Sequence, residues 1–322
     1  MLPALAAHPT SDLLRISDLD SDRLEWLLDL SLAMRRSPRG WLGAHPGGMV
    51  ACYFAKPSTR TRVSFEGAIW RLGMLPVMLR PDELQLGRGE PIADTARVLS
   101  SYASAIVVRT FAQEDVQEIA RAADVPVINA LTDEHHPCQA LADLLTIRTR
   151  FGRLRGVRVA YVGDGNNVAH SLMEAAALAG MEIRIATPDG YEPDPGVVSG
   201  AQGRARGTGG AVVLTHDPEV AVRDADVVYT DVWVSMGQDG ERDRRLHDLR
   251  PYRVSGRLMG LAAPGAVFMH CLPAHRGEEV APEVIDGVRS VVFQQAANRL
   301  PTEQAVLHSL LERSAVARRS GG

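Results

Sequence analysis

One short segment of the chain combines several residue types that bind anions: Ser58-Thr59-Arg60-Thr61-Arg62. Residues 50–55 before it form an apolar run typical of a strand, which Pro57 ends because proline cannot continue a ladder. After it, apolar residues recur at helical spacing as far as Gly73. The free N–H groups and dipole of a helix start favour an anion, and arginine can bind two phosphate oxygens at once. The segment therefore predicts a phosphate site, with an ordinary capped helix as the alternative.

Two further segments place polar side chains directly after predicted strands. Arg109 follows the apolar run 105–108, and the turn His135-His136-Pro137-Cys138-Gln139 follows the run 125–129. Because ligands bind at the carboxyl ends of strands in open parallel sheets, we expect both to face the phosphate site. A surface arginine and a capping histidine are the alternatives. The polar loop 80–91, which contains two glycines, is a candidate lid.

The second half of the chain repeats this arrangement with different chemistry. Three loops follow predicted strands: Gly163-Asp164-Gly165-Asn166-Asn167, Asp231-Val232-Trp233-Val234-Ser235-Met236-Gly237 and His270-Cys271-Leu272-Pro273. A carboxylate at a strand end beside a flexible Ser-Met-Gly turn suits a site for a cationic side chain. The alternatives are an ordinary loop carboxylate at Asp231 and a small buried hydrophobic residue at Cys271.

A dinucleotide site and a zinc site are the other interpretations of these segments. The glycines after residue 162 suggest a dinucleotide site, but Val168 stands where the third glycine of that motif belongs and the strand 182–186 does not end in an acidic residue. A nicotinamide-binding oxidoreductase, or a non-catalytic ligand-binding module, is therefore the alternative from another class. A zinc site is disfavoured because its candidate ligands lack finger-like spacing. Those ligands are His135, His136, Cys138, His270, Cys271 and His275.

Composition bounds the class of protein. The chain has 322 residues, of which 45% are hydrophobic, and a net charge of −4 with its arginines spread along the sequence. These values favour a globular enzyme and argue against a nucleic-acid-binding role. Three cysteines without C-x-x-C spacing favour reduced thiols in a cytoplasmic protein. We expect neither a transmembrane segment nor a signal peptide, because the apolar start 1–7 lacks basic residues.

Alternating strand and helix patterns predict an α/β protein with two doubly wound domains, each around a central parallel sheet and joined by helices. The expected domains are 1–150, which binds the phosphate compound, and 151–300, with a closing helix 301–317 packing back on the first domain. We expect the Pro/Gly-rich stretch 192–210 to be a loop and residues 291–292 to form a last strand.

Residues 54–66 resemble the carbamoyl-phosphate signature of the aspartate/ornithine carbamoyltransferase superfamily, and four later segments resemble its ornithine branch in order and spacing. The resemblance covers nearly the whole chain. It implies transfer of the carbamoyl group of carbamoyl phosphate to the side-chain amine of L-ornithine, giving L-citrulline and phosphate in arginine metabolism. It also implies no metal or organic cofactor, a homotrimer or a multiple of trimers, and a loop at Gln85 that reaches the neighbouring subunit's site. Because Ala297 replaces the usual glutamate of an A-E-N-R run, another diamino acid is the alternative substrate.

The residue patterns and the resemblance together assign three sets of site residues. The catalytic groups are Arg60, Arg109 and His136, which stabilise the carbonyl oxygen, and Asp231 and Cys271, which hold the amine and take its proton. The carbamoyl-phosphate contacts are Ser58, Thr59, Arg60, Thr61, Gln85, Arg109, His136, Gln139, Cys271, Leu272 and Arg299. The ornithine contacts are Asn167, Asp231, Ser235, Met236 and Cys271. Domain closure and trimer formation would complete the site.

Overall fold

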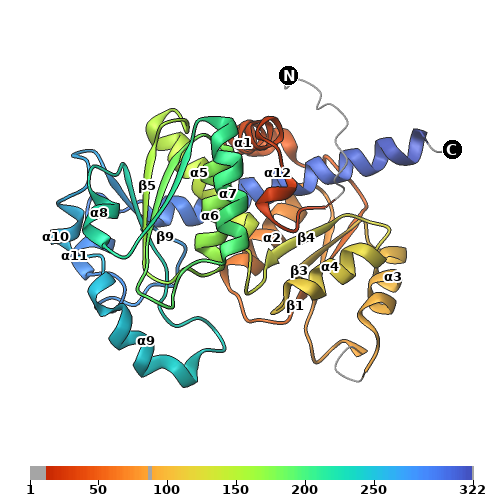
Figure 1. The fold of residues 1–322 in the computed structure, drawn as a ribbon. Coiled ribbons are helices and arrows are strands. Elements are labelled where there is room, and N and C mark those ends of the chain that lie inside the picture. Colours follow the sequence, from red (N-terminus) through yellow and green to blue (C-terminus); the bar gives the residue numbers. More distant parts are fainter. Residues whose placement is uncertain (1–11, 86–88, 321–322) are drawn as a thin grey trace. The chain divides into compact units, whose positions relative to one another are not determined.

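The structure, a computed structural model, describes residues 12–85 and 89–320 of the chain. It has two compact units, one made of Met1–Leu141 with Asn298–Gly322 and the other of Ala142–Ala297. Each unit contains one parallel sheet flanked by helices, which confirms the expected fold class. The chain passes from one unit to the other within two helices, α5 (Pro137–Phe151) and α12 (Val292–Ser320) (Figure 1).

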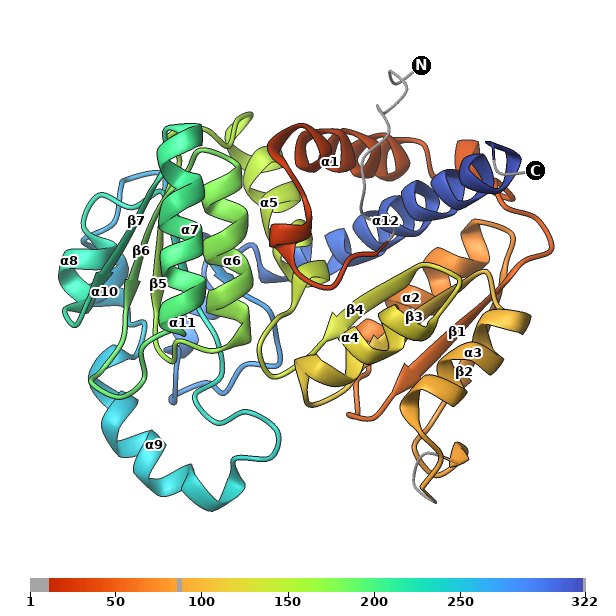
Figure 2. The same cartoon turned by 45° about the vertical axis from the view of Figure 1, so that its right-hand side comes forward.

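The first unit is built on a four-stranded sheet with the strand order β2-β1-β3-β4. Its strands are β1 (Met49–Phe54), β2 (Leu75–Leu79), β3 (Ala105–Arg109) and β4 (Val127–Leu131), and its helices include α1 (Ser21–Arg36), α2 (Arg60–Arg71), α3 (Ile92–Tyr102) and α4 (Gln113–Ala122). Helices α3 and α4 cover one face of the sheet and α2 lies behind it (Figure 2). Ile106, Val108 and Val116 belong to the buried aliphatic cluster on the α3–α4 side.

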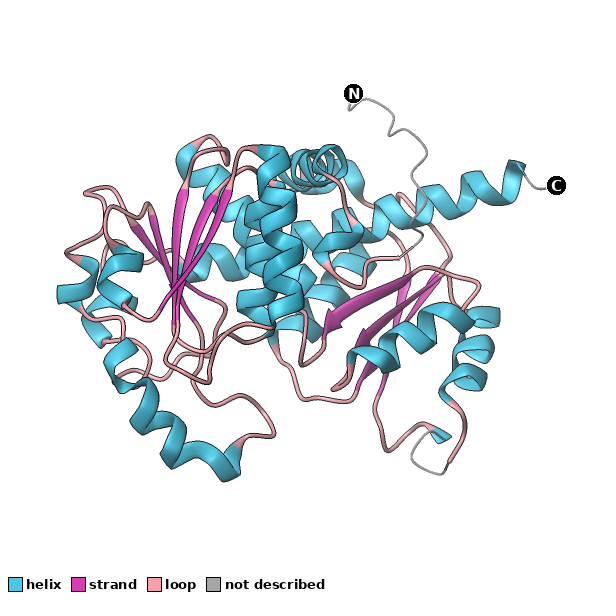
Figure 3. Ribbon diagram, in the orientation of Figure 1, coloured by secondary structure: helices cyan, strands magenta, loops and turns pink. Residues whose placement is uncertain are grey.

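The second unit is built on a five-stranded sheet with the strand order β7-β6-β5-β8-β9. Its strands are β5 (Arg158–Val162), β6 (Glu182–Ala186), β7 (Ala211–Thr215), β8 (Val227–Thr230) and β9 (Val267–His270). Its helices include α6 (Asn167–Leu178), α7 (Pro195–Thr208), α8 (Pro218–Val222), α9 (Arg242–Leu249), α10 (Gly256–Met259) and α11 (Pro282–Ile285). Helices α6 and α7 lie side by side on one face of this sheet, and α8 lies on the other (Figures 2 and 3). Among the residues that the structure describes, no helix is both long and apolar enough to span a membrane.

In both sheets the strand order reverses at one position. The chain runs from β1 outward to β2 and then from β3 outward to β4, so the reversal in the first sheet lies between β1 and β3. In the second sheet it lies between β5 and β8. Ligands of open α/β sheets bind outside the carboxyl ends of strands at such a reversal. Each unit therefore has one position at which its strand order favours ligand binding.

The turn between β1 and α2 follows from the local sequence. Residues 50–52 of β1 are buried, in keeping with the near-continuous apolar character of a central parallel strand. Helix α2 buries Phe65, Ala68 and Ile69 on one face. It is followed by Gly73, whose φ of +83° lies in the left-handed region that glycine adopts at no steric cost. The local sequence thus accounts for the buried face and the C-terminal end of the predicted phosphate helix.

The expected loop at 192–210 is wrong, because most of this stretch forms helix α7. Proline at the first helical position lacks only an N–H that has no partner there, so Pro195 starts the helix. The Asp194 carboxylate accepts hydrogen bonds from the next free N–H groups, and Gly209 ends the helix with a φ of +79°. Val198 and Ala201 on its inner face are buried. Capping and burial therefore outweigh the helix-weakening glycines inside it.

The expected strand at 291–292 and the helix start at Pro301 are also wrong. Val292 and Pro301 both belong to one helix, α12, with Pro301 in its interior, whereas Val291 precedes the helix and its N–H donates to the carbonyl of Phe268 at 3.0 Å. A proline there costs about 3 kcal/mol because it cannot donate to the carbonyl four residues earlier. Two buried leucines, Leu307 and Leu310, each contribute roughly 1.5–3 kcal/mol. Burial therefore outweighs the lost bond, and the part of α12 from Asn298 belongs to the first unit.

Replacing the cap of α7 tests this account of the helix start. Asp194 Oδ1 accepts from the N–H groups of Gly196 (2.8 Å) and Val197 (3.0 Å). Asp194→Ala should lower the free energy of unfolding by about 1 kcal/mol. The free energy of unfolding of Asp194→Asn, which keeps an acceptor at the same place, should lie within roughly a few tenths of a kcal/mol of the wild-type value. Guanidinium denaturation curves measure both, and equal losses in the two variants would contradict the capping role.

Candidate active site

The predicted phosphate turn lies at the strand-order reversal of the first unit. β1 and β3 pair with Phe54 opposite Arg109, and Ala55 N–H donates to the carbonyl of Arg109 at 2.8 Å. Ser58 Oγ accepts from the backbone N–H of Thr61 at 3.2 Å and so caps the start of α2. The turn, the helix N-terminus and the end of β3 therefore meet at one edge of the sheet, as the residue spacing predicted.

Three arginines share one buried histidine as a neighbour. His136, which is 5% exposed, begins the turn into α5. Burial lowers the pKa of its imidazole well below the ordinary value, and the positive charges of Arg299, Arg109 and Arg60 lower it further. His136 is therefore neutral near pH 7, and the fixed positive charge of this cluster comes from the arginines.

Arg299 connects α12 to the phosphate helix and to α5. Its guanidinium donates to Gln139 Oε1 at 2.8 Å and to Thr61 Oγ1 at 3.3 Å. It also donates from Nε and Nη2 to Glu303 Oε1, at 2.9 and 2.6 Å. Sequence reasoning left Arg299 without a carboxylate because Ala297 replaces the family glutamate. Glu303, one helical turn later, is the carboxylate that pairs with it.

A buried lysine braces the same edge of the sheet. Lys56, the only lysine in the chain, is 3% exposed and forms an ion pair with Asp133. Its ammonium also lies 4.3 Å from the centre of the Phe111 ring. Asp133 N–H donates in turn to the carbonyl of Phe111 at 2.8 Å. Lys56 therefore ties the phosphate turn to the loops that follow β3 and β4, which is a role for its ammonium that spacing alone did not assign.

Gln85 is a predicted carbamoyl-phosphate contact in the candidate lid. Its side chain is exposed in the loop after β2. Residues 86–88 of the candidate lid lie outside the described residues.

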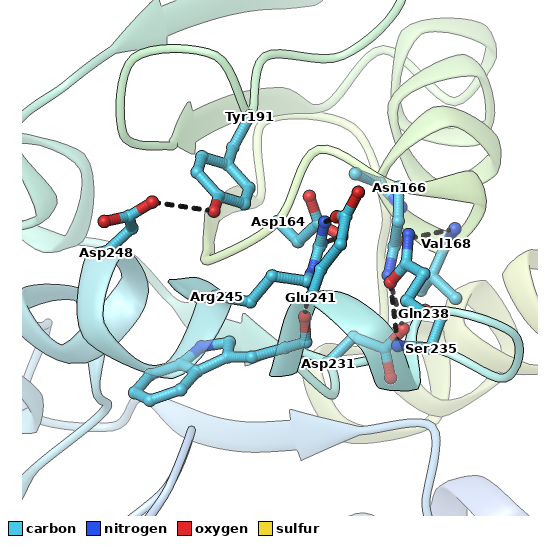
Figure 4. A network of polar contacts seen from close by, with 12 residues as sticks. Asp164, Asn166, Val168, Tyr191, Asp231, Ser235, Gln238, Glu241, Arg245 and Asp248 are labelled. Atoms are coloured by element: carbon cyan, nitrogen blue, oxygen red, sulfur yellow. Dashed lines mark hydrogen bonds and ion pairs between the residues drawn. The ribbon is translucent and has the colours of Figure 1, made fainter. Parts of the chain in front are cut away.

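The second unit centres on the carboxylate of Asp231. This residue follows β8, whose Thr230 pairs with His270 of β9, so Asp231 and Cys271 leave neighbouring strand ends. Cys271 Sγ donates to Asp231 Oδ1 at 2.8 Å. Asn166 Nδ2 donates to Asp231 Oδ2 at 2.8 Å (Figure 4). Three loops from the β5–β8–β9 edge therefore meet at one carboxylate.

Asn166, which sequence reasoning did not single out, is the residue that joins Asp231 to α6. Its Oδ1 accepts from the N–H groups of Val168 (3.0 Å) and Ala169 (3.3 Å), which makes it the N-cap of α6. The same oxygen accepts from the hydroxyl of Tyr161 at 3.2 Å. Asn167, the expected ligand residue, is the first residue of that helix. The Asn-Asn pair is a cap signal in the sequence, but spacing does not tell which of the two caps the helix.

Close packing explains the glycine that suggested a dinucleotide site. A Cβ atom on Gly165 would lie 2.4 Å from the nitrogen of Pro193 and 2.6 Å from the carbonyl oxygen of Tyr191. Gly165 N–H donates to that same carbonyl at 2.8 Å. Glycine is therefore required here by the chain's own backbone.

The Ser-Met-Gly loop is held by an arginine that sequence reasoning missed. Arg245 of α9 donates from Nε to the carbonyl of Trp233 at 2.6 Å and forms an ion pair with Asp164 (Figure 4). Its guanidinium also lies 5.0 Å from the centre of the Tyr191 ring. Burial raises the pKa of Asp164 to about 6 although Arg245 opposes the shift. Glu241, four residues earlier, also lies 3.6 Å from the Arg245 guanidinium, but no local pattern marks Asp164 or the Trp233 carbonyl, which are distant in sequence.

Within the loop, the backbone of Ser235 is held by a hydrogen bond and the side chain of Met236 is exposed. Ser235 N–H donates to Gln238 Oε1 at 2.9 Å, whereas the side chain of Met236 is 49% exposed. On the next strand end, Leu272 has a φ of +59°, which is uncommon for a residue with a side chain, and its N–H donates to His270 Nδ1 at 2.8 Å. Strained backbone at a ligand-binding strand end is a common feature of functional loops.

Comparison with known proteins identifies the family. The family model described as "Aspartate/ornithine carbamoyltransferase, carbamoyl-P binding domain" matches residues 11–149, and the "Asp/Orn binding domain" model of the same family matches residues 155–310. The chain belongs to the aspartate/ornithine carbamoyltransferase family. The carbamoyl-P model spans the phosphate turn, Arg109 and His136, and the Asp/Orn model spans the Asp231–Cys271 pair and Arg299.

Relatives within this family share about half of their residues with the chain. An ornithine carbamoyltransferase of Anoxybacillus flavithermus is 52% identical over 302 residues, covering 93% of this chain and 96% of that protein. One from Carboxydothermus hydrogenoformans is 50% identical, covering 95% and 99%. The solved ornithine carbamoyltransferase of Pyrococcus furiosus superposes with a TM-score of 0.89 at 50% identity, covering 92% and 95%.

The carboxylate that pairs with Arg299 makes the stability of this family member depend on pH. Burial raises the pKa of Glu303 from 4.5 to about 7, with Arg299 opposing the shift. Because the folded chain then binds this proton more tightly than the unfolded chain, stability should fall as pH rises from about 4.5 to 7.

Glu303→Gln should flatten this part of the stability profile. Denaturation midpoints at pH 5 and pH 7.5 should differ less in this variant than in the wild type, because one proton no longer couples to folding. Glu66→Gln, which removes the partly exposed partner of Arg62, should keep the wild-type difference. An unchanged pH dependence in Glu303→Gln would contradict the assignment.

Proposed function

We propose that this chain transfers the carbamoyl group of carbamoyl phosphate to the side-chain amine of L-ornithine, giving L-citrulline and phosphate. The observation that carries the proposal is the contact of Cys271 with Asp231 at the strand ends of the Asp/Orn-binding domain. A carboxylate suits a cationic side chain, whereas a second anionic substrate would be repelled. The relatives that match nearly the whole chain are named ornithine carbamoyltransferase, which supports the same substrate.

Deprotonation of the amine is the main energetic demand of this reaction. An alkyl amine such as that of ornithine titrates near ~10.4, so removing its proton at pH 7 costs about 4–5 kcal/mol. We assign Asp231 to hold the ammonium form and Cys271 to contact the nitrogen, with the proton passing to this pair. Asn166 keeps the carboxylate in place because it also caps α6.

We assign the first unit to bind carbamoyl phosphate, whose carbonyl oxygen gains negative charge during the reaction. Ser58, Thr59 and Thr61 would bind the phosphate at the start of α2, with Gln139 and Arg299 supporting Thr61. Arg60 and Arg109 would face the carbonyl oxygen, and neutral His136 would donate a hydrogen bond to it. Donors of this kind are each worth roughly 2.7–4 kcal/mol to a transition state.

The reaction follows as an acyl transfer. The neutral amine nitrogen attacks the carbonyl carbon, and the carbonyl oxygen takes the negative charge of a tetrahedral intermediate. The bond from carbon to the phosphate oxygen then breaks, and phosphate leaves with the electron pair. The phosphate leaving group is already activated, so the remaining demands are charge stabilisation and removal of one proton from nitrogen.

We assign carbamoyl phosphate to residues 1–150 with the end of α12, and ornithine to residues 151–300, and we propose that the chain forms a homotrimer. Large apolar side chains on α2, β2 and α3 support burial against other copies. These are Val63, Trp70, Leu75, Val98 and Tyr102, which are 48–68% exposed. The exposed Gln85 would then contact carbamoyl phosphate in a neighbouring subunit, and Leu272 and Met236 would contact substrate from the second unit.

A substrate panel tests the proposed reaction. Purified enzyme with carbamoyl phosphate should release phosphate with L-ornithine, and the ureido product should be citrulline. L-Lysine, L-2,4-diaminobutyrate and L-aspartate should react at least about a hundredfold more slowly, since their amines do not reach the same position or carry the wrong charge. If any of these amines reacted faster than L-ornithine, that amine would be the substrate and the proposal would be wrong.

Two substitutions separate the roles of the two units. Arg60→Ala should lower kcat by about 10²–10³ and raise the KM for carbamoyl phosphate, because an oxyanion donor is lost. Cys271→Ala should raise the KM for ornithine and leave the KM for carbamoyl phosphate within about twofold. Arg60→Lys and Cys271→Ser are the matched controls, because they keep the charge and a hydrogen-bond donor. The opposite pattern of KM changes would overturn these assignments.

A further inference from the structure

A group of metal-ligand side chains lies in the first unit on residues that the proposed reaction does not use. His45 lies in the segment before β1, and His308 and Glu312 are one turn apart on α12. His45 Nε2 and His308 Nδ1 are 2.8 Å apart, and His45 Nε2 is 3.8 Å from Glu312 Oε1. One ligand atom from each of the three side chains lies within 4.8 Å of the other two.

These separations are close to those of a tetrahedral site. Zinc binds imidazole nitrogen at about 2.0–2.1 Å and carboxylate oxygen at about 2.0–2.2 Å, which puts two ligands of one tetrahedron roughly 3.4 Å apart. The distances of 2.8 Å and 3.8 Å fall on either side of that value. A bound ion would lengthen the shorter and shorten the longer by about half an ångström, which small side-chain rotations supply.

We propose that His45, His308 and Glu312 bind a divalent cation of the zinc class, with water in the fourth position. Two imidazoles and one carboxylate are ligands that suit Zn²⁺, Co²⁺ and Ni²⁺. The ion replaces the hydrogen bond between the rings. The ring that donates this bond then carries its proton on its other nitrogen, so each imidazole stays neutral and offers a lone pair.

The surroundings allow such an ion to enter. The Glu312 side chain is 59% exposed and that of His45 is 16% exposed, so the site opens to solvent. The ring of Trp41, at the end of the short helix η2 (Pro38–Trp41), meets the His308 ring edge-on at 5.3 Å between centroids. One side of the cluster is therefore supported by an aromatic ring and the other is accessible.

The ion would join α12 to the end of the phosphate helix. The segment that carries His45 is bound to the C-terminal end of α2 by backbone hydrogen bonds, from Gly43 to Arg71 (2.9 Å), from His45 to Leu72 (2.7 Å) and from Gly47 to Gly73 (3.2 Å). α12 holds the other end of α2 through Arg299 and Thr61. A metal at His45 would thus fasten α2 to α12 at both ends, and its effect is on stability.

Metal binding to the untagged, EDTA-treated protein tests the proposal. Zn²⁺ should bind and raise the Tm by at least about 3 °C when present at a hundredfold excess over its Kd. His308→Gln and Glu312→Gln should each weaken binding by about tenfold or more and reduce the shift. His247→Gln, which removes a histidine whose side chain is 88% exposed, is the matched control and should bind as the wild type does. The turnover rate of Glu312→Gln should equal that of the wild type. Because the Glu312 side chain is exposed, this variant should fold normally, so weaker metal binding would not be explained by misfolding.

Cobalt distinguishes this site from another possible position. Asp231, His270 and Cys271 also place ligand atoms within 4.8 Å of one another, and binding there would give sulfur-to-cobalt absorption in the near ultraviolet. Co²⁺ at the proposed site should lack that absorption. The proposal is overturned if the wild type shows no stabilisation by Zn²⁺, if Glu312→Gln and His308→Gln bind it as tightly as the wild type, or if the sulfur band accounts for all bound cobalt.

Discussion

The arrangement of both candidate sites depends on where parallel strand order reverses. In a parallel sheet the carboxyl ends of all strands lie at one edge. Where the strand order reverses, the connections that leave two adjacent strands run in opposite directions and leave room for a ligand between them. In the first unit this position lies between β1 and β3 and gathers Arg60, Arg109 and His136. In the second it lies between β5 and β8 and gathers Asn166 and Asp231. The chemistry differs between the units, but the constraint that positions it is the same.

Charge is handled differently in the two units. The first collects three arginines around a neutral histidine, and the buried carboxylate of Glu303 offsets part of that charge. The second holds its carboxylate with a thiol and an amide, both uncharged donors. A cationic partner at Asp231 would therefore compete only with neutral hydrogen-bond donors among these contacts. This contrast fits an anionic substrate on one sheet and a cationic one on the other.

The local signals in the sequence were sufficient for the phosphate helix and for the strands of the two sheets, because each depends on near neighbours, but they also predicted a strand at 291–292 that the structure does not have. Arg299 and Glu303, four residues apart, were visible as a pattern, but attention went to Ala297 in place of the family glutamate. The Asp194-Pro195 start of α7 was visible too, but the Pro/Gly-rich composition led to a loop prediction. Arg245 was not predictable in this way. Its partners, Asp164 and the carbonyl of Trp233, come together only through the tertiary fold.

Lys56 has a consequence for the chemistry of the whole protein surface. The chain has 35 lysines and arginines, one of which is lysine, so arginine accounts for the other 34. That single ε-amine is 3% exposed and engaged with Asp133 and Phe111. Reagents and enzymes that acylate, acetylate or ubiquitinate lysine therefore meet a surface of guanidinium groups that they do not modify. Among side chains, the protein offers such chemistry one target, and the fold shields it.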